Sequence, residues 1–407
     1  MSVDTYGGMH PVSKLLDYEE FMDALRRAIR PKRTVEKVGL MEAVGRVCAS
    51  DVLALSDMPP FWRATFDGYA VRAEDTRGAN REVPAKLRVI GTSKPGVPVK
   101  VRVHRGEAVR VFTGGEIPEG ADAVVLVENT ELVGQIVKVH TEVKPSANLN
   151  AAGSDIRKGE VLIRAGTIVR PTDISLAASQ GFKEIGVYQK PSVLIIPTGN
   201  EVKPVGSKLR YGEIYDSNSH GVAALLKEAG GAVEISKPLK DDVDLIEATV
   251  RKVTAYDLVV FIGGSSAGAE DYVSMAVSKL GKVLAHGVRL SPGRPTLFGK
   301  VGETFVVGLP GHPASSLAVT IMVLNPLMMW LTGRPKTYRT VEAVLDSDIT
   351  GVEEGFTYFR TVRLEDGIAK LVYRSSSMYS SFLGADGYIV FRDVAPKKGE
   401  KVIVNLL

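Results

Sequence analysis

Residues 190–333 alternate short apolar runs with segments of helical character, and this alternation constrains the fold more than any other feature of the sequence. The runs at residues 193–196 and 258–262 are apolar at every position, as strands covered on both faces require. A helix that ends near Gly230 and Gly231 lies between them. Strands and helices that alternate at this spacing predict a doubly wound, mainly parallel sheet.

The segments that flank this region follow other patterns. Residues 18–53 carry apolar residues at helical spacing and are expected to be helical, and a further helix is predicted over residues 171–181. Residues 69–143 and the tail from about residue 338 alternate apolar and polar positions, so we expect a β-rich domain and a small β-barrel or sandwich. The strands predicted in the β-rich domain are residues 87–90, 99–103, 108–112, 123–127 and 136–139.

The composition limits the classes of partner. A formal net charge of +4 spread along the chain is too weak and too dispersed for a nucleic-acid-binding surface. The longest apolar run, residues 317–331, is interrupted by Thr320 and Pro326, so a buried helix with a kink or break before Pro326 is expected rather than a membrane span. Cys48 is the one cysteine, and the N-terminal residues do not resemble a secretory signal. These features predict a reduced, cytoplasmic protein.

Three glycine-containing turns follow strands of the predicted sheet. In an open parallel sheet, ligands bind beyond the carboxyl ends of the strands. Exposed backbone N–H groups in such turns, together with a following helix N-terminus, favour a phosphate. The turns are residues 197–201, 263–268 and 308–313, and the candidate binding residues are Thr198, Gly199, Gly263, Gly264, Ser265, Ser266, Gly268, Pro310, Gly311, Pro313 and Ser315. We therefore expect a small phosphorylated molecule at this edge of the sheet.

Three acidic residues lie beside these turns: Glu201, Asp241 and Asp271. Carboxylates next to a bound phosphate would repel it without a cation, and hard oxygen ligands of this kind favour Mg²⁺. Asp241 and Asp271 could instead only cap helices, so both interpretations stay open. The convergence of three turns on one edge of the sheet favours the magnesium site. The six histidines lack zinc spacing, and the sequence has no Walker, nucleophile-elbow or GxGxxG pattern.

A set of motifs extends from these turns over most of the chain. They are residues 66–71, 111–114 with 118–124, 153–156, 198–201, 263–268 with Asp271, 292–295 and 308–313. With these motifs the sequence closely resembles the molybdopterin molybdenumtransferase family, which includes MoeA and the C-terminal part of gephyrin. The resemblance runs from about residue 15 to the end, and its motifs are specific when they are taken together.

The resemblance implies an architecture with a MogA/MoaB-like central sheet. Its four domains would be a discontinuous α+β linker and dimerisation domain at residues 1–57 and 145–188, a β-rich lid domain at 58–144, the molybdopterin-binding α/β domain at 189–333 and a C-terminal small β-barrel at 334–407. It also implies an elongated homodimer, in which the lid domain of one subunit faces the α/β domain of the other. That arrangement would bring Asp67, Thr113 and Asp155 to the active site.

The resemblance also implies a reaction. Such enzymes bind adenylylated molybdopterin and molybdate, release AMP with the help of a divalent cation and leave the metal on the dithiolene. Glu201, Asp241 and Asp271 would hold Mg²⁺ on the phosphoanhydride in a Lewis-acid and templating role. Arg289 and Arg294 are candidates for binding the oxyanion, because a tetrahedral dianion favours guanidinium groups, although both could equally be surface charges.

Five positions depart from the family pattern: Asn150, Asn200, Gly287, Ser291 and His312. Asn150, Gly287 and Ser291 stand where relatives have basic residues, so they reduce the positive charge expected around the oxyanion. Tungstate in place of molybdate is therefore left open. The alternatives to the transferase are a non-catalytic scaffold protein and a molybdopterin adenylyltransferase. The adenylyltransferases resemble only the α/β region, and one of them is also expected as the upstream partner of this chain.

Overall fold

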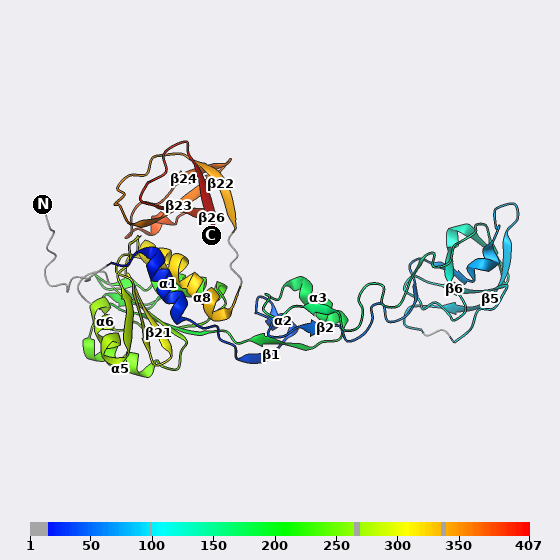
Figure 1. Cartoon of the computed structure of the whole chain (residues 1–407), viewed down its shortest axis with the longest axis horizontal. Helices are drawn as coiled ribbons and strands as arrows, with labels where there is room; N and C mark the ends of the chain where they lie inside the picture. The colour runs from blue at the N-terminus through cyan, green and yellow to red at the C-terminus, as the bar shows by residue number, and fades with distance from the viewer. Residues whose placement is uncertain (1–14, 98–99, 264–268, 335–338) are drawn as a thin grey trace. The chain divides into compact units, whose positions relative to one another are not determined.

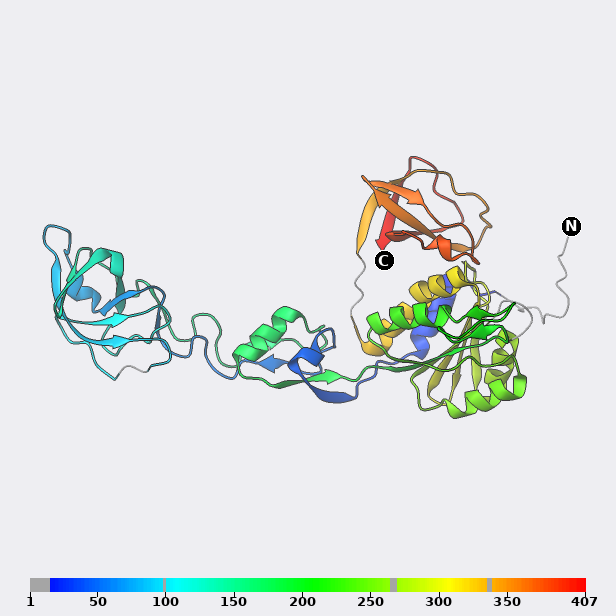
Figure 2. The ribbon, with the colours of Figure 1, turned by 180° about the vertical axis from the view of Figure 1, so that it is seen from behind.

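The computed structural model describes residues 15–97, 100–263, 269–334 and 339–407, without the side chains of residues 269–271. The chain separates into two compact units (Figures 1 and 2). Unit 1 contains the described residues of segments 1–49, 166–169 and 186–407, and unit 2 contains those of segments 50–165 and 170–185. The boundaries of the four expected domains stay a prediction.

A six-stranded sheet forms the centre of unit 1. In order across the sheet, its strands are β16 (Ala232–Ile235), β13 (Ser192–Pro197), β17 (Leu258–Ile262), β21 (Thr304–Leu309), β20 (Leu297–Val301) and β18 (Lys282–His286). The first four are parallel, and β20 and β18 complete the sheet as antiparallel strands. The prediction of a doubly wound, mainly parallel sheet is therefore confirmed.

Helices cover both faces of this sheet (Figure 1). One face carries α1 (Tyr18–Ala28), α4 (Asn218–Glu228), α7 (Pro313–Val319) and α8 (Asn325–Thr332), and the other carries α5 (Val243–Lys252) and α6 (Ala269–Leu280). Successive side chains of a strand enter different cores. Ile195 and Val260 lie in the core with α1 and α4, whereas Ile196 and Phe261 lie in the core with α5 and α6. This arrangement explains why β13 and β17 are apolar at every central position.

The apolar run at residues 317–331 is not one regular helix. α7 continues through a π-helical turn, Thr320–Leu324, into α8, so the helix geometry changes just before Pro326, as predicted. Within the described ranges, this is the one helix long and apolar enough to cross a membrane by length and composition, and 72% of its most apolar window is buried inside the protein. Val323 and Leu327 pack in the larger core of unit 1, which accounts for the apolar character of the helix.

The C-terminal part of unit 1 is a closed barrel. Its strands are β22 (Thr340–Leu345), β23 (Thr357–Glu365), β24 (Ile368–Leu371), β25 (Gly387–Arg392) and β26 (Lys401–Leu406), and a 3-10 helix, η4 (Tyr379–Ser381), precedes β25. β23 pairs with both β24 and β25, and β22 and β26 complete the ring, so the tail forms a barrel rather than a sandwich. The short strand β19 (Leu290–Ser291) of the α/β region pairs with β23.

The N-terminal segment of unit 1 differs from the prediction. α1 ends at Ala28, and β1 (Val35–Gly39) and the short α2 (Leu40–Ala43) come after it, so the helical prediction for residues 18–53 holds only over α1 and α2 and is wrong for the rest. Pro31 disfavours helical backbone at the residue before it and therefore helps to end the helix. β1 then pairs with β12 (Glu184–Tyr188).

Unit 2 is built around a mixed six-stranded sheet. In order, its strands are β7 (Ala123–Leu126), β4 (Gly68–Val71), β6 (Glu107–Val111), β5 (Ala85–Ser93), β9 (Ile136–Val139) and β8 (Thr130–Val133). Two-stranded ladders pair β2 (Val52–Leu53) with β11 (Val161–Ile163) and β3 (Arg63–Ala64) with β10 (Leu149–Asn150). The remaining elements are η1 (Ala73–Thr76), η2 (Val127–Asn129) and α3 (Pro171–Ser179), which confirms the helix predicted at residues 171–181.

One predicted strand of unit 2 is wrong. In the described part of residues 99–103, Arg102 makes an isolated bridge with Glu119 and no strand forms. Val103 nevertheless packs into the core of the unit from this loop. The alternation in the sequence therefore reflects burial of single side chains rather than strand pairing.

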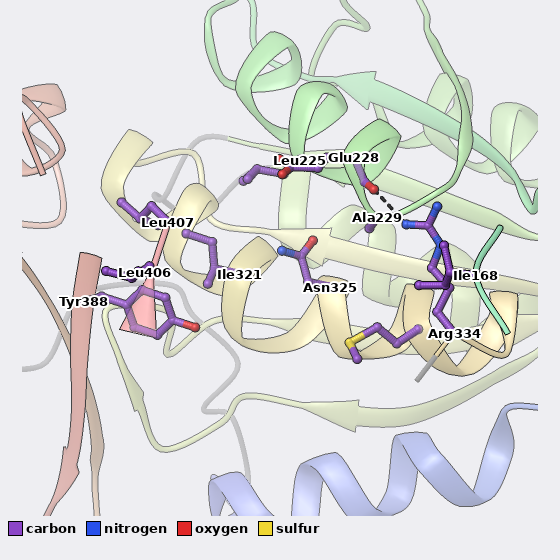
Figure 3. A pocket seen from close by; sticks show the side chains of 11 residues that line it. Ile168, Leu225, Glu228, Ala229, Ile321, Asn325, Arg334, Tyr388, Leu406 and Leu407 are labelled. Atoms are coloured by element: carbon purple, nitrogen blue, oxygen red, sulfur yellow. Dashed lines mark hydrogen bonds between the residues drawn. The ribbon is translucent and has the colours of Figure 1, made fainter. Parts of the chain in front are cut away.

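Arg334 links three segments of unit 1 (Figure 3). It follows Gly333, which ends α8 with a left-handed backbone (φ 70°). Its guanidinium donates to the carbonyl oxygen of Glu228, at 2.9 Å, and to the carbonyl oxygen of Gly45. Burial lowers the pKa of Arg334, and the charge of neighbouring Arg46 lowers it further. The two carbonyl groups thus stabilise a guanidinium that is largely removed from water.

A cavity of about 250 Å³ lies beside Arg334 (Figure 3). It is lined by Ile168, Leu225, Glu228, Ala229, Ile321, Asn325, Met329, Arg334, Tyr388, Leu406 and Leu407. Most of these side chains are apolar, and none of them is a candidate site residue. We therefore regard this cavity as a packing feature between α4, α8 and the barrel.

Arg334→Met is expected to lower the free energy of unfolding by about 1–2 kcal/mol, because two carbonyl oxygens lose their donor, one of them at a partly buried position. Arg334→Lys keeps the charge but not the planar fork, so a smaller loss is expected. Chemical denaturation followed by circular dichroism measures both changes. Equal midpoints for Arg334→Met and the wild type would show that the link does not contribute to stability.

Candidate functional site

A cavity of about 390 Å³ lies at the carboxyl edge of the sheet in unit 1. Its lining combines the ends of β13 and β17, the turn after β21, the start of α4 and a loop of the barrel. The lining residues are Pro197, Thr198, Glu201, Val202, Ile214, Tyr215, Asp216, Ser217, Asn218, Ile262, Gly263, Gly311, His312, Pro313, Ser377 and Tyr379. Parts of all three predicted turns thus meet in one cavity.

The first turn shapes one wall of the cavity. The Thr198 N–H donates to the Ile262 carbonyl at 2.7 Å, and the Gly199 N–H donates to the Leu239 carbonyl at 3.0 Å. Both groups are therefore engaged within the protein, and the expectation that this turn exposes its N–H groups to a phosphate is wrong. The hydrogen bonds instead fix the turn between β17 and the segment that leads to α5.

Glu201 is held directly above this turn. A Cβ atom at residue 199 would lie 3.0 Å from both carboxylate oxygens of Glu201, and Gly199 has φ +136°, so only glycine suits the position. The Glu201 carbonyl accepts a hydrogen bond from the Ile214 N–H at 3.0 Å. This bond extends the pairing of β14 (Val202–Lys203) with β15 (Ile214–Tyr215), so the backbone of Glu201 is fixed as well.

Asp241 lies next to Glu201 and does not cap a helix. The cap of α5 is Asp242, whose carboxylate accepts from the Leu245 N–H at 2.9 Å. The Oδ1 atom of Asp241 is buried and has no hydrogen-bond partner among the residues that the structure describes. Burial raises the pKa of Asp241; the Asn200 backbone N–H opposes this shift, and the charge of Glu201 adds to it. Two adjacent carboxylates with an unsatisfied oxygen form a site that a cation would stabilise.

The third acidic residue, Asp271, lies in the first turn of α6, and its side chain falls outside the described residues. The candidates Gly264, Ser265, Ser266 and Gly268 also fall outside them. The described side chains contain no group of three or more His, Cys, Asp or Glu residues placed for a metal ion. Of the three acidic residues expected to bind magnesium, the structure describes the side chains of Glu201 and Asp241.

The third turn is rigid. Ser316 Oγ donates to the Pro310 carbonyl, and the Asn218 side-chain amide donates to the Gly311 carbonyl at 2.6 Å. Pro313 occupies the first turn of α7, and Ser315 is buried in the same turn. The start of α7 therefore presents a fixed backbone to the cavity.

The start of α4 forms the remaining wall, and the sequence did not predict its role. Asp216 caps the helix, because its carboxylate accepts from the N–H of Ser219 at 3.2 Å and from the Ser219 hydroxyl. Ser217 occupies the N-cap position but makes no capping hydrogen bond through its side chain. Ser217 instead contacts the Tyr379 hydroxyl of the barrel. No motif in the sequence pointed to Tyr379.

The two arginines proposed for the oxyanion lie at the junction of the α/β region and the barrel, and neither lines the described part of the cavity. Arg294 forms an ion pair with Glu353 at 3.1 Å and lies over the ring of Phe356, 4.7 Å from its centroid. Arg289 has an exposed side chain, while its backbone N–H donates to Leu16 and its carbonyl accepts from Thr357.

In unit 2, the structure brings Asp67 and Thr113 together. The backbone N–H and the hydroxyl of Thr113 both donate to one carboxylate oxygen of Asp67, each at 2.8 Å. The backbone hydrogen bond is the largest of the effects that lower the pKa of Asp67, and the hydroxyl and the Arg110 charge act in the same direction. Asp155 is exposed, and its backbone N–H donates to the Met58 carbonyl at 3.0 Å.

Comparison with known families matches the chain in two parts. Residues 16–181 match the MoeA N-terminal region (domain I and II), and residues 194–330 match the probable molybdopterin binding domain. The second match covers the sheet except the first two residues of β13, and it covers every residue of the cavity that comes from the α/β region.

Similar proteins match over nearly the full length. A molybdopterin molybdenumtransferase of Haemophilus influenzae is 30% identical over 87% of this chain and 89% of its own, and molybdopterin molybdenumtransferase 2 of Mycobacterium tuberculosis is 34% identical over 86% and 87%. The crystal structure of a molybdopterin biosynthesis MoeA protein from Pyrococcus horikoshii has a TM-score of 0.87 and 32% identity, covering 97% of this chain and 99% of the other. These similarities in sequence and structure show that the chain belongs to the MoeA family.

Proposed function

We propose that this chain is a molybdopterin molybdenumtransferase, a transferase of molybdenum cofactor biosynthesis. It would insert molybdate or tungstate into adenylylated molybdopterin and release AMP. Relatives with this name match more than four fifths of the chain. The observation that carries the proposal is the Glu201 carboxylate in a cavity where strand-to-helix turns meet, together with its electrostatic effect on the partly buried Asp241 in the segment beside this edge.

Mg²⁺ fits the residues at this edge of the sheet. The buried oxygen of Asp241 lacks a partner among the described residues, and the charge of Glu201 helps to raise the pKa of Asp241. A divalent cation would give both carboxylates a positively charged partner. The proposed ligands are therefore Glu201, Asp241 and, from the first turn of α6, Asp271. When bound, the ion would act as a Lewis acid on the phosphoanhydride and offset the charge that develops as AMP leaves.

The other residues of the cavity would bind and orient the substrate. The loop of residues 263–268 and the start of α6 are the proposed phosphate site, since the N–H groups of the first turn are already engaged. The rigid start of α7, with Gly311, Pro313 and Ser315, would shape the site near the dithiolene. Arg289 is the better candidate for the oxyanion, because Arg294 is held by Glu353.

The assembly and location of the protein belong to the same proposal. A cytoplasmic homodimer, supplied with substrate by an adenylyltransferase, would place Asp67, Thr113 and Asp155 of one subunit in the active site of the other. Asp67 is suited to this role, because its two hydrogen bonds from Thr113 hold the carboxylate in place and lower its pKa. The match to the MoeA N-terminal region argues against an adenylyltransferase, which would need only the α/β region.

Glu201→Gln and Asp241→Asn are each expected to reduce magnesium-dependent AMP release at least about a hundredfold, because the cation loses a charged ligand worth several kcal/mol. The assay combines the protein with adenylylated molybdopterin, Mg²⁺ and molybdate or tungstate, and measures AMP. Asp242→Asn is the matched control, since asparagine caps a helix as well as aspartate does. Full release by Asp241→Asn would remove Asp241 from the mechanism, and no release by the wild type would favour the scaffold protein.

Asp241→Asn is also expected to raise the Tm of the metal-free protein at pH 7. The pKa of Asp241 is raised in the folded state, so its ionisation lowers stability as the pH rises through that pKa, and an amide avoids this loss. Excess Mg²⁺ should raise the Tm of the wild type and leave that of Asp241→Asn nearly unchanged. Thermal scans between pH 4 and pH 8 with and without Mg²⁺ measure both effects. A lower Tm for metal-free Asp241→Asn would contradict the proposed cost of ionising the buried Asp241 carboxyl group.

Thr113→Val removes the hydroxyl donor of Asp67 but keeps the backbone donor, so a partial rise in the pKa of Asp67 is expected. Carbon-detected NMR titration of the Asp67 carboxyl group measures the shift. Thr130→Val, at a threonine whose hydroxyl donates to a backbone carbonyl, is the control and should leave Asp67 unchanged. An identical titration curve in Thr113→Val would show that the hydroxyl does not hold the carboxylate ionised.

A further inference from the structure

A loop of the barrel, residues 374–381, forms part of the cavity wall. The Ser376 carbonyl accepts a hydrogen bond from the Ala314 N–H at 3.0 Å, and Ser376 Oγ lies 3.2 Å from His312 Nδ1. Both contacts are made with the turn at the start of α7. The barrel is therefore attached directly to the third turn of the site, and Ser377 and Tyr379 line the cavity beside it.

The loop is also fixed internally. Ser381 is fully buried, and its hydroxyl accepts from the N–H groups of Arg374 and Ser375, each at 3.1 Å, and donates to the Ser375 carbonyl at 2.8 Å. The Thr361 hydroxyl of β23 donates to the Ser381 carbonyl. The residues between these points are consequently presented in a defined conformation rather than as a free loop.

The Tyr379 hydroxyl contacts other residues of the protein, whereas much of its ring is exposed. The hydroxyl contacts Ser217 Oγ and lies 3.5 Å from Asn218 Oδ1, so the end of the side chain is held at the start of α4. The Asn218 amide in turn donates to the Gly311 carbonyl. The residue is nevertheless 56% exposed although it lines the cavity, so much of its ring surface is accessible from the cavity or from solvent.

We propose that Tyr379 is a substrate-binding residue of this cavity, and that its ring stacks on a planar, nitrogen-containing double ring of the substrate. The inference rests on the proposed function, whose substrate carries two rings of this chemistry, a pterin and an adenine. A tyrosine ring held by its hydroxyl offers such a ring a preorganised apolar face, and most of the remaining lining is small, polar or aliphatic.

The position of Tyr379 also explains how the barrel contributes to the site. The acidic pair and the turns of the sheet supply charge and phosphate recognition but no large aromatic surface. The exposed tyrosines in the cavity are Tyr379 and Tyr215, and the Tyr215 hydroxyl is held by the Ser207 carbonyl at 2.9 Å in another loop. The loop of residues 374–381 therefore adds an aromatic face from the barrel to the one that Tyr215 offers from the α/β region.

The test compares Tyr379→Ala, Tyr379→Leu and Tyr379→Phe in the full chain by titration with AMP and, separately, with neopterin, both in the presence of Mg²⁺. We expect Tyr379→Ala and Tyr379→Leu to weaken binding of one of the two probes about tenfold, as the loss of one base–aromatic stack predicts. Tyr379→Phe should remain within about threefold of the wild type, since it keeps the ring. The probe that responds identifies which ring of the substrate stacks on Tyr379.

Tyr211→Ala is the matched control, because Tyr211 is a fully exposed tyrosine of the same unit that does not line the described cavity. Unchanged affinity for both probes in Tyr379→Ala and Tyr379→Leu would overturn the inference. An equal loss in Tyr379→Phe would also overturn it, because the hydroxyl contact and not the ring would then bind the substrate.

A second measurement does not depend on the alanine variant. In Tyr379→Trp, the added fluorescence should be quenched by the same probe, whereas Tyr211→Trp should show no quenching beyond that of the native Trp62 and Trp330. Absence of quenching with both probes contradicts the inference. If the protein binds a probe through Tyr379 but releases no AMP, the proposed function is wrong and this inference stands. If the protein releases AMP but binds both probes independently of Tyr379, this inference is wrong and the proposed function stands.

Discussion

The parallel pairing of β13 with β17 determines where the chemistry of unit 1 can lie. Its register sets Pro197 beside Ile262, so both strands end at the same level and the turn after each begins at the same edge. Hydrogen bonds connect this edge to Leu239 and so place the segment that contains Asp241 beside it. A slip of one residue would move every apolar side chain of β13 to the other core, so the two cores hold the site in register.

The sequence predicted those parts of the fold in which the pattern of apolar residues matches the burial of their side chains. β13 and β17 were recognisable because strands between two cores need apolar residues at every position. α3 was recognisable because the spacing of its apolar residues depends only on neighbouring positions of the sequence. The prediction of continuous helix after α1 was wrong, because apolar spacing alone does not show where Pro31 helps to end the helix. Residues 99–103 were misassigned because Val103 is buried from a loop, and strand pairing is decided by distant partners.

The candidate site was predictable where its residues follow strands directly, and not elsewhere. Glu201 stood out because no helix begins there, but Asp241 could not be told from its neighbour Asp242 until the structure assigned the cap to Asp242. Tyr379 was not predictable, because its place in the cavity depends on contacts between the barrel and α4 across more than 150 residues of sequence. Contacts at that separation leave no periodic signal in either segment.

Two of the candidate carboxylates, Asp67 and Asp241, have opposite electrostatic environments. Asp67 receives two hydrogen bonds from Thr113, which lower its pKa and satisfy the charge within unit 2. Asp241 is partly buried beside another carboxylate, with one oxygen unsatisfied among the described groups, and its pKa is raised. A cation that bound Asp67 would have to compete with the hydrogen bonds from Thr113, so its binding would be weak there. At Asp241 it would instead satisfy a buried oxygen that has no partner among the described groups, so its binding would be favourable. The difference in environment therefore favours Asp241, rather than Asp67, as a ligand of the metal.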